Sequence, residues 1–293
     1  MKPGVIEISH PDKVLFPGAG VTKRDLAGYY ERIADRLLPH AKGRPLTLRA
    51  FPGGIGEDGF FNKNAPGHFP DFIDRIRVPT RGAGAGVAQM SSADEAADLV
   101  YFAGQNVIEL HAALSTETDL EKPDQIIIDF DPPGDEFEKA RTVALGFGEL
   151  ADSMGLKVFW KTTGSKGYHA HLPIRPERGF DAVKDFAKAL ARKLHEALPG
   201  TTTLEQRKDR RGGKVYIDVL RNAYGQTAVL PYSVRAREGA PVATPIRSDE
   251  LKDGGLRPDR YTVKNIFQRL GQIDDPWRDF HRRRIGAKRL EAL

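Results

Sequence analysis

QIIIDFD, residues 125–131, is the segment that decides the fold of this chain. Its apolar side chains predict a buried strand, which Pro132 and Pro133 end. Because strand side chains alternate between two faces, Asp129 and Asp131 share one face, with Cα atoms about 7 Å apart. An unpaired buried carboxylate is costly, and the segment contains no Lys or Arg. A divalent cation, which prefers carboxylate oxygens, is the expected partner.

Two other interpretations of this pair remain open. Asp131 alone would suit the cap of a following helix, although this leaves Asp129 unexplained. Both residues would also suit the solvated end of a surface strand.

Asp218 strengthens the metal interpretation. It interrupts a second apolar strand, KVYIDVL (214–220), with Val215, Ile217 and Val219 on the opposite face. Three carboxylates from two strands suit a pair of cations about 3.5–4 Å apart, the arrangement used in phosphoryl transfer. Polymerases, some nucleases and some cyclases share this arrangement of carboxylates. The triad therefore indicates the type of reaction better than it indicates the substrate.

The loop TGSKG (163–167) joins two predicted strands, LKVFWKT (156–162) and YHAHLPI (168–174). Its small residues would let backbone N–H groups approach an anion, with charge added by Lys166. A plain hairpin turn is the alternative, and the spacing is not that of a Walker A loop. His169 and His171 share one face of the second strand, either as metal ligands or as ordinary hydrogen-bonded histidines.

Helical patterns surround these strands. Thr22 and Asp25 predict a capping box for a helix that stops between Pro39 and Gly43, and Ser92 and Glu95 predict another. Further helices are expected over 135–154, 181–198 and from near Thr262, and further strands over 46–51 and 226–235. TRGAGAGVA (80–88) is typical of a mobile loop. Strands joined by both helices and tight loops predict a mixed α/β (α+β) fold.

The composition restricts the class of protein. The 293 residues carry 45 Lys and Arg against 40 Asp and Glu, with a pI of about 9.3, which permits a polyanionic partner without requiring one. The absence of Cys excludes disulfides and Cys-based metal sites. We find no apolar signal core and no run long enough to span a membrane, so we expect no export signal, no membrane partner and an interior compartment.

Several motifs together resemble one known family. DFDPP, TGSKGYHAHLPI, YIDVLRN and GQTAVLPYSVRAREGAPVATP occur in an order similar to that of the polymerase domain of bacterial ATP-dependent DNA ligase D. HPDKVLFP, VTKRDLAGYY and GFFNKNAP extend the resemblance over roughly residues 5–250. That domain belongs to the archaeo-eukaryotic primase superfamily. The resemblance implies one primase-polymerase domain over 1–293, with an N-terminal α/β half (about 1–120), an RRM-like catalytic palm (about 121–250) and a basic helical tail (about 251–293).

The resemblance also implies a gap-filling polymerase of non-homologous end joining, located in the bacterial cytoplasm and associated with the nucleoid. Asp129, Asp131 and Asp218 would bind two Mn²⁺ or Mg²⁺ ions and add NTPs, favoured over dNTPs, to DNA ends and gapped duplexes. The implied nucleotide-binding residues are Arg49, His111, Ser165, Lys166, Gly167, His169, Gln226, Arg235 and Arg237. The implied DNA contacts are Lys13 and Lys23 for a downstream 5′-phosphate, Phe60 and Phe61 for template stacking, and Lys63, Arg211 and the 80–88 loop for aligning ends.

Several of these residues also fit a simpler structural role. Lys23 suits a phosphate site at a helix N-terminus or an ordinary solvated Lys, and the two Phe suit base stacking or a core. Arg235 and Arg237 would alternate along one strand and both reach a triphosphate, or lie on a solvated edge. The cluster Arg207, Lys208, Arg210, Arg211 and Lys214 suits DNA backbone or a charged loop.

Partners and rival functions complete the expectations. Ku is an expected partner, and ligase and phosphoesterase modules are expected in cis or in trans, because this chain lacks a ligase Lys-x-Asp-Gly motif. The alternatives are a stand-alone primase or primase-polymerase, a metal-dependent nuclease or phosphodiesterase using the same triad, and a non-catalytic DNA-end binding module.

Overall fold

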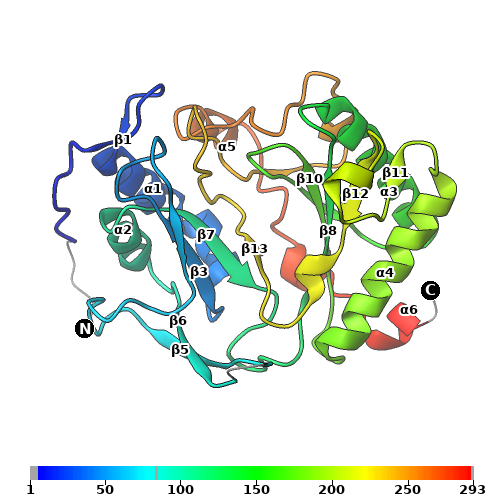
Figure 1. The fold of residues 1–293 in the computed structure, drawn as a ribbon, viewed down its shortest axis with the longest axis horizontal. Coiled ribbons are helices and arrows are strands. Elements are labelled where there is room, and N and C mark those ends of the chain that lie inside the picture. Colours follow the sequence, from blue (N-terminus) through cyan, green and yellow to red (C-terminus); the bar gives the residue numbers. More distant parts are fainter. Residues whose placement is uncertain (1–5, 83–84, 292–293) are drawn as a thin grey trace. The chain divides into compact units, whose positions relative to one another are not determined.

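The computed structural model describes residues 6–82 and 85–291, and the chain divides into two compact units. The first comprises 1–120, 227–243 and 261–267, and the second comprises 121–226, 244–260 and 268–293. Both combine helices and strands (Figure 1), so the expected mixed α/β fold is confirmed. Residues 83 and 84 of the expected mobile loop lie outside the described residues.

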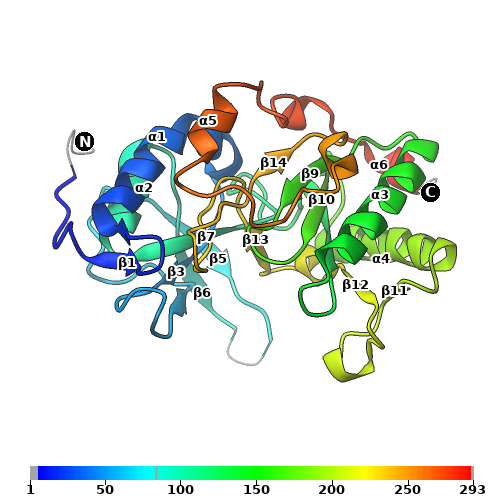
Figure 2. The same ribbon diagram turned by 90° about the horizontal axis from the view of Figure 1, so that it is seen from above.

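The first unit is built on a sheet of order β13-β7-β3-β6-β5, with β4 paired to β3 and a separate β1-β2 ribbon. Its strands are β1 (Val14–Phe16), β2 (Val21–Thr22), β3 (Leu46–Ala50), β4 (Phe60–Asn62), β5 (Arg75–Pro79), β6 (Val87–Ser91), β7 (Val107–Ala113) and β13 (Thr227–Val229). Helices α1 (Lys23–Ala41) and α2 (Ala96–Gly104) pack side by side (Figure 2). The apolar face of α1 is buried as its spacing predicts.

The start of α1 is confirmed and that of α2 needs correction. Thr22 and Asp25 form the expected capping box, while Pro39 lies inside the last turn and the helix continues to Ala41. In α2 the boundary lies one turn later than Ser92 suggests. Asp98 there accepts the backbone N–H groups of Asp94 and Glu95.

The second unit has a six-stranded sheet of order β11-β12-β8-β10-β9-β14, antiparallel except for the first pair. Its strands are β8 (Gln125–Asp131), β9 (Phe159–Thr162), β10 (Tyr168–Pro173), β11 (Thr202–Thr203), β12 (Val215–Asp218) and β14 (Pro245–Ile246). Its helices are α3 (Phe137–Ser153), α4 (Phe180–Ala197) and α6 (Ala287–Glu291), and α5 (Ile266–Leu270) has residues of both units. Short 3-10 helices cover Lys208–Arg210, Leu220–Asn222, Glu250–Lys252 and Phe280–Arg282.

Helices α3 and α4 cover one face of this sheet (Figures 1 and 2). Phe130 of β8 contacts Phe147 of α3, with ring centroids 5.6 Å apart. The α3 face is richer in Ala than expected: Phe137, Leu150 and Met154 are only half-buried, while the fully buried residues are Ala140, Val143, Ala144, Phe147 and Ala151. Small residues let the helix lie close to the strands. Because side chains alternate, Asp129 and Asp131 point to the opposite face.

The predicted strand over 226–235 is much shorter than expected. It ends at Val229, because Pro231 has no N–H to donate and Tyr232 takes a positive φ of 66°. Arg235 and Arg237 therefore do not alternate on one strand.

Candidate active site

The carboxylates lie on adjacent antiparallel strands of the second unit. Asp218 of β12 is the register partner of Asp129 of β8, and Tyr216 is that of Asp131. On the other side of β8, His169 of β10 is also opposite Asp129. Directly opposed residues share a face, so Asp218, Asp129 and His169 form one row across three strands.

The two plainer interpretations of Asp129 and Asp131 are wrong. Helix α3 begins at Phe137 with Glu136 at its N-cap, so Asp131 does not cap it. The side chain of Asp129 is only 14% exposed and lies 3.2 Å from His169 Nε2, so Asp129 is not solvated at a surface edge.

Crowding perturbs the acids. Burial, followed by the charges of Asp129 and Asp218, raises the pKa of Asp131 from 3.8 to about 7. Burial also raises the pKa of Asp218, although its carboxylate accepts the N–H of Leu220 at 2.7 Å. Arg211 and Arg221 oppose both shifts. A site that disfavours its own negative charges fits a cation as a partner, because a cation removes the repulsion between them.

The donor set also suits hard divalent ions, because it consists of carboxylate oxygens. Within the described ranges, no three His, Asp or Glu side chains are already arranged to hold an ion together. The metal ions expected from the sequence therefore stay a prediction.

The TGSKG loop is confirmed as a tight connection between β9 and β10. A Cβ on Gly167 would lie 2.2 Å from the carbonyl oxygen of Phe130, so only glycine lets the loop lie against β8. The expected use of its amides needs correction at two positions. The N–H groups of Ser165 and Gly167 donate to Thr163 Oγ1, at 3.2 and 3.1 Å, instead of facing outward to an anion.

A cationic pocket of about 410 Å³ adjoins Asp131. Lys166, Lys208 and Arg211 line it together with Gly134 and Gly213. Lys166 forms an ion pair with Asp135 at 2.9 Å, and the Arg211 guanidinium lies 4.0 Å from the Tyr216 ring centroid. Lys166, predicted to bind the nucleotide, and Arg211, predicted to align DNA ends, thus line one pocket beside Asp131. Lys and Arg side chains in such a place suit phosphate groups.

His171 is held by its surroundings as the plainer interpretation expects. Its Nδ1 lies 2.9 Å from Gln125 Oε1, and its ring lies near that of Trp277, with centroids 4.7 Å apart. Trp277 stacks in turn on Phe280. The segment after α5 therefore covers part of the sheet face that carries the carboxylates.

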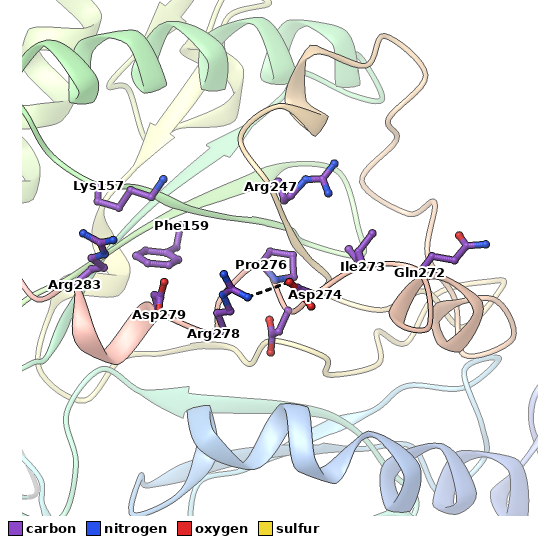
Figure 3. Close-up of a pocket in the computed structure, with 11 residues that line it drawn as sticks. Lys157, Phe159, Arg247, Gln272, Ile273, Asp274, Pro276, Arg278, Asp279 and Arg283 are labelled. Atoms are coloured by element: carbon purple, nitrogen blue, oxygen red, sulfur yellow. Dashed lines mark hydrogen bonds and ion pairs between the residues drawn. The ribbon is translucent and has the colours of Figure 1, made fainter.

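A larger cavity of about 640 Å³ lies elsewhere in the second unit (Figure 3). Its lining combines Lys157, Arg247, Arg278 and Arg283 with acidic residues, and Arg278 is paired with Asp274 at 3.0 Å. None of the three candidate catalytic Asp lines it. Its size therefore does not make it the site of the chemistry.

In the first unit, three residues predicted to bind the nucleotide meet around a carboxylate that the sequence motifs did not indicate. Glu109 lies 2.9 Å from His111 Nε2, 3.2 Å from Arg235 Nε and 3.5 Å from Arg49 Nη1, and it accepts the N–H of Ala236 at 3.0 Å. We call Arg49, Glu109, His111 and Arg235 the Glu109 cluster. A carboxylate at Glu109 within the apolar strand VIELHAA was the signal that would have found it.

Phe60 and Phe61 are not core residues. They are 50% and 55% exposed on β4, a large exposure for such apolar rings. Phe61 also adjoins the Glu109 cluster: its ring lies 5.7 Å from that of His111 and 5.0 Å from the Arg49 guanidinium. Lys63, Gln226 and Arg237 are at least partly exposed, and none of them belongs to the Glu109 cluster.

Lys13 and Lys23 are neighbours, since the Lys23 N–H donates to the Lys13 carbonyl at 2.9 Å. Lys13 is exposed, and its Nζ contacts the Pro52 carbonyl. Lys23 begins α1 as expected, but it is only 3% exposed and donates to the Ser9 carbonyl, so it is not a solvated Lys. Burial, followed by the charge of Lys13, lowers the pKa of Lys23.

Many of the other basic side chains are paired. In the 207–214 cluster, Arg207 pairs with Asp209, Lys214 donates to the Pro199 carbonyl, and Lys208 lines the pocket beside Asp131. Near the C-terminus, Arg284 lies 3.7 Å from Asp124, and Arg289 donates to the carbonyls of Met154 and Gly155. These contacts tie the basic tail to the second unit.

Comparisons with known proteins identify the family of this chain. Residues 22–277 match the family described as "LigD, primase-polymerase domain". A solved structure described as "Polymerase Domain from Mycobacterium tuberculosis Ligase D in complex with DNA" has 29% sequence identity and a TM-score of 0.88, covering 97% of this chain and 100% of that one. The family and the fold make this chain an enzyme of the nucleotidyltransferase class.

Curated relatives narrow the class. The "Multifunctional non-homologous end joining protein LigD" of Pseudomonas aeruginosa is 34% identical over 98% of this chain and 34% of its own length. The "Bifunctional non-homologous end joining protein LigD" of Bacillus subtilis is 30% identical over 94% of this chain and 44% of its own length. The chain thus spans less than half the length of each. It belongs to the LigD primase-polymerase domain family.

Proposed function

We propose that this chain extends DNA ends and fills short gaps during non-homologous end joining by transferring nucleotides to a 3′-hydroxyl. The observation that supports it most is the pairing of Asp218 with Asp129, next to Asp131 and its cationic pocket. Family membership supports the polymerase reaction, and the similar solved structure, which is a complex with DNA, supports the nucleic-acid substrate.

In the proposed mechanism, Asp129, Asp131 and Asp218 hold two divalent cations, Mn²⁺ or Mg²⁺. When bound, such ions stabilise charge on the attacking and leaving oxygens of an in-line displacement. The carboxylate of Asp129 is kept in place by His169, whose Nε2 lies 3.2 Å away.

Lys166, Lys208 and Arg211 bind the triphosphate in this proposal. They lie in one pocket with Asp131, and their positive charges favour the negative charge that accumulates on the phosphates during transfer. Arg211 already offsets part of the charge repulsion on Asp131. Ser165, which precedes Lys166 in the TGSKG loop, contacts the sugar of the nucleotide, with ribonucleotides favoured.

The DNA contacts are the proposal's second part. Exposed Phe60 and Phe61 stack on template bases, since every base offers a ring face to an aromatic side chain. Lys13, which is exposed beside the start of α1, binds a downstream 5′-phosphate through its ammonium group. We further propose that the chain works on bacterial chromosomal ends in the cytoplasm, with Ku and with ligase and phosphoesterase modules in cis or in trans. Among the described residues, none of the helices has the length and apolar character to cross a bilayer.

One assay separates this function from its rivals. The protein is incubated with Mn²⁺, a gapped duplex carrying a downstream 5′-phosphate, and each NTP singly. Addition of only the nucleotide complementary to the template supports the proposal. Shortening of the primer identifies a nuclease, and binding with neither change identifies a DNA-end binding module. Synthesis that starts without any primer identifies a stand-alone primase.

A further inference from the structure

The cavity of about 640 Å³ in the second unit has no role in the proposed mechanism (Figure 3). The segment 272–283, which follows α5, forms much of its lining, and Arg283 of the basic tail belongs to that segment. Lys157 and Phe159 line it from the start of β9, and Arg247 lines it just after β14. The cavity therefore brings part of the basic tail, which the proposed function also leaves unused, together with cations from two other segments.

Most charged side chains of this lining are neutralised by a neighbour. The ion pairs are Arg278 with Asp274 at 3.0 Å, Arg247 with Asp249 at 3.0 Å, and Arg282 with Asp279 at 3.7 Å. Each pair joins one positive and one negative group, so none of them adds net charge to the cavity.

Two cations of the lining stand apart from these pairs. Over residues 6–82 and 85–291, neither the ammonium group of Lys157 nor the guanidinium group of Arg283 has a hydrogen-bond or ion-pair partner. The remaining acid, Asp275, accepts the backbone N–H of Trp277 at 2.9 Å. The lining has four basic and three acidic side chains, a net charge of +1, which favours an anion that carries one negative charge.

The lining also offers apolar surface, from Phe159, Ile273 and Pro276. A nucleic-acid backbone combines the two properties that this cavity selects, because each phosphodiester has one negative charge and is flanked by the carbon atoms of its sugars. A phosphate monoester has a charge closer to −2 at neutral pH. Lys and Arg are the usual protein contacts of backbone phosphates.

The sheet relates this cavity to the carboxylates. Phe159 of β9 is the register partner of His171 of β10, which is paired in turn with Ile127 of β8. Opposed residues share a face, and so do residues two apart, so Phe159 is on the same face as Asp129. Two strand spacings and two residues separate their Cα atoms, a distance of roughly 12 Å. Phosphates spaced about 3.4 Å apart along a duplex cover this distance in about three or four nucleotides.

We propose that Lys157 and Arg283 bind one backbone phosphodiester of the DNA whose 3′ end lies at the carboxylates, with the sugar beside it against Ile273 and Pro276. This inference rests on the proposed function, which puts a primer end at Asp129. The cavity and the three acids all belong to the second unit. The basic tail thereby extends the DNA contact beyond the site of nucleotide transfer.

The first test is the salt dependence of binding to a fluorescein-labelled gapped duplex, measured by anisotropy. Lys157→Ala combined with Arg283→Ala removes two exposed side chains, so the protein should fold as the wild type does. We expect the slope of log K against log salt concentration to become shallower by about 0.7–0.9, the value for one lost phosphate contact. An unchanged slope overturns the inference.

The matched control is Arg192→Ala combined with Lys193→Ala. It removes the same two residue types from the exposed side of α4, which covers the opposite face of the sheet. We expect this control to keep the wild-type slope. An equal change of slope in both double variants also overturns the inference, because it would reflect the total charge of the protein and not the cavity.

The second test locates the DNA. The chain has no Cys, so Gln272→Cys gives a single attachment point for an iron–EDTA cleavage reagent at an exposed, uncharged position of the lining. We expect cuts within about five nucleotides of the primer 3′ end, and none there from Glu196→Cys on α4. Absence of these cuts with the Gln272→Cys protein contradicts the proposed position of the DNA.

Both tests measure binding, so they separate this inference from the proposed function. A wild-type protein that extends the primer while the Lys157 and Arg283 variant keeps the wild-type slope contradicts the inference alone. A wild-type protein that binds the gapped duplex but adds no nucleotide contradicts the proposed function, and the slope and the cuts still decide whether DNA occupies the cavity.

Discussion

Asp218 of β12 and Asp129 of β8 are direct cross-strand partners in an antiparallel pair. This pairing brings together residues 89 positions apart in sequence, and it puts their carboxylates on the sheet face opposite α3. With Asp131 next along that face of β8, three acids lie within one small area. Their mutual repulsion and burial are the source of the predicted behaviour towards cations and pH.

The first prediction concerns stability without divalent ions. The pKa of Asp131 is raised from 3.8 to about 7 by burial and then by Asp129 and Asp218, so the folded state favours its protonated form. The stability this contributes is complete below the unfolded-state pKa and is lost as pH rises through the folded-state value. Asp131→Asn should therefore stabilise the protein near pH 8, by on the order of 1–2 kcal/mol after solvent screening, and hardly at all near pH 4.

Thermal unfolding in a chelator measures this, with the exposed Asp152→Asn as the control for the same substitution. A variant no more stable than the wild type near pH 8 would show that the carboxylates do not repel one another as their positions suggest.

The second prediction concerns cation binding. Because an ion that binds only the folded state stabilises it, Mn²⁺ should raise the unfolding temperature of the wild type in proportion to the logarithm of its concentration above the dissociation constant. Asp129→Ala combined with Asp131→Ala should abolish the response. Calorimetric titration of both proteins with Mn²⁺ provides the direct check, and equal heats in the two would place the ion elsewhere.

The third prediction concerns Phe60. Its exposed ring contributes little to folding, so Phe60→Ala should change the free energy of unfolding by no more than about 0.5 kcal/mol. Loss of one stacked base should nevertheless weaken binding to a gapped duplex by about 1–3 kcal/mol. Fluorescence anisotropy with labelled gapped DNA measures the affinity, and Leu204→Ala, at an exposed apolar residue with no assigned DNA contact, is the control. Unchanged affinity in Phe60→Ala would remove the stacking role.

The fourth prediction separates the two lysines. Lys13→Ala should lower the preference for a 5′-phosphate over a 5′-hydroxyl about threefold to tenfold, because one charge-assisted contact is lost. Lys23→Ala should also destabilise the fold, since the Lys23 side chain is buried and bonded to the Ser9 carbonyl. Gel shifts at fixed salt with both DNA ends test this, and Lys42→Ala, exposed at the end of α1, controls for lost charge. An unaltered preference in Lys13→Ala argues against the assignment.

Local patterns predict the structure correctly where short-range physics decides it. The box of Thr22 and Asp25 starts α1, and the alternation in QIIIDFD gives β8. Each of these depends on residues within one or two turns of chain. The sequence therefore contains the information directly.

Long-range arrangement is predicted less well. The row of Asp218, Asp129 and His169 depends on strand register, which no local pattern specifies. The pocket shared by Arg211 and Lys166 and the burial of Lys23 also depend on distant segments. The resemblance to a known family supplied part of this information. It implied roles for His111 and Arg235, but it did not indicate that both side chains contact Glu109.

Glu109 illustrates why part of the candidate site could not be predicted from the sequence. A Glu beside a His in an apolar strand is common enough to pass unnoticed, and its importance appears only when Arg49 and Arg235 approach from other segments. The early end of β13 at Val229 was also not predicted. Pro231 and Tyr232 turn the chain so that Arg235 points to Glu109 instead of continuing a strand.

The most direct test of the proposed chemistry is primer extension by two variants. One is Asp218→Asn, which removes the carboxylate that β12 contributes, and the other combines Asp129→Ala with Asp131→Ala on β8. Both proteins are incubated with Mn²⁺, a 5′-phosphorylated gapped duplex and the complementary NTP, and DNA binding is measured in parallel. We expect both to bind DNA with near wild-type affinity and to lose extension by at least about a thousandfold, as when a group essential to transfer is removed. Extension by Asp218→Asn at the wild-type rate would contradict the account.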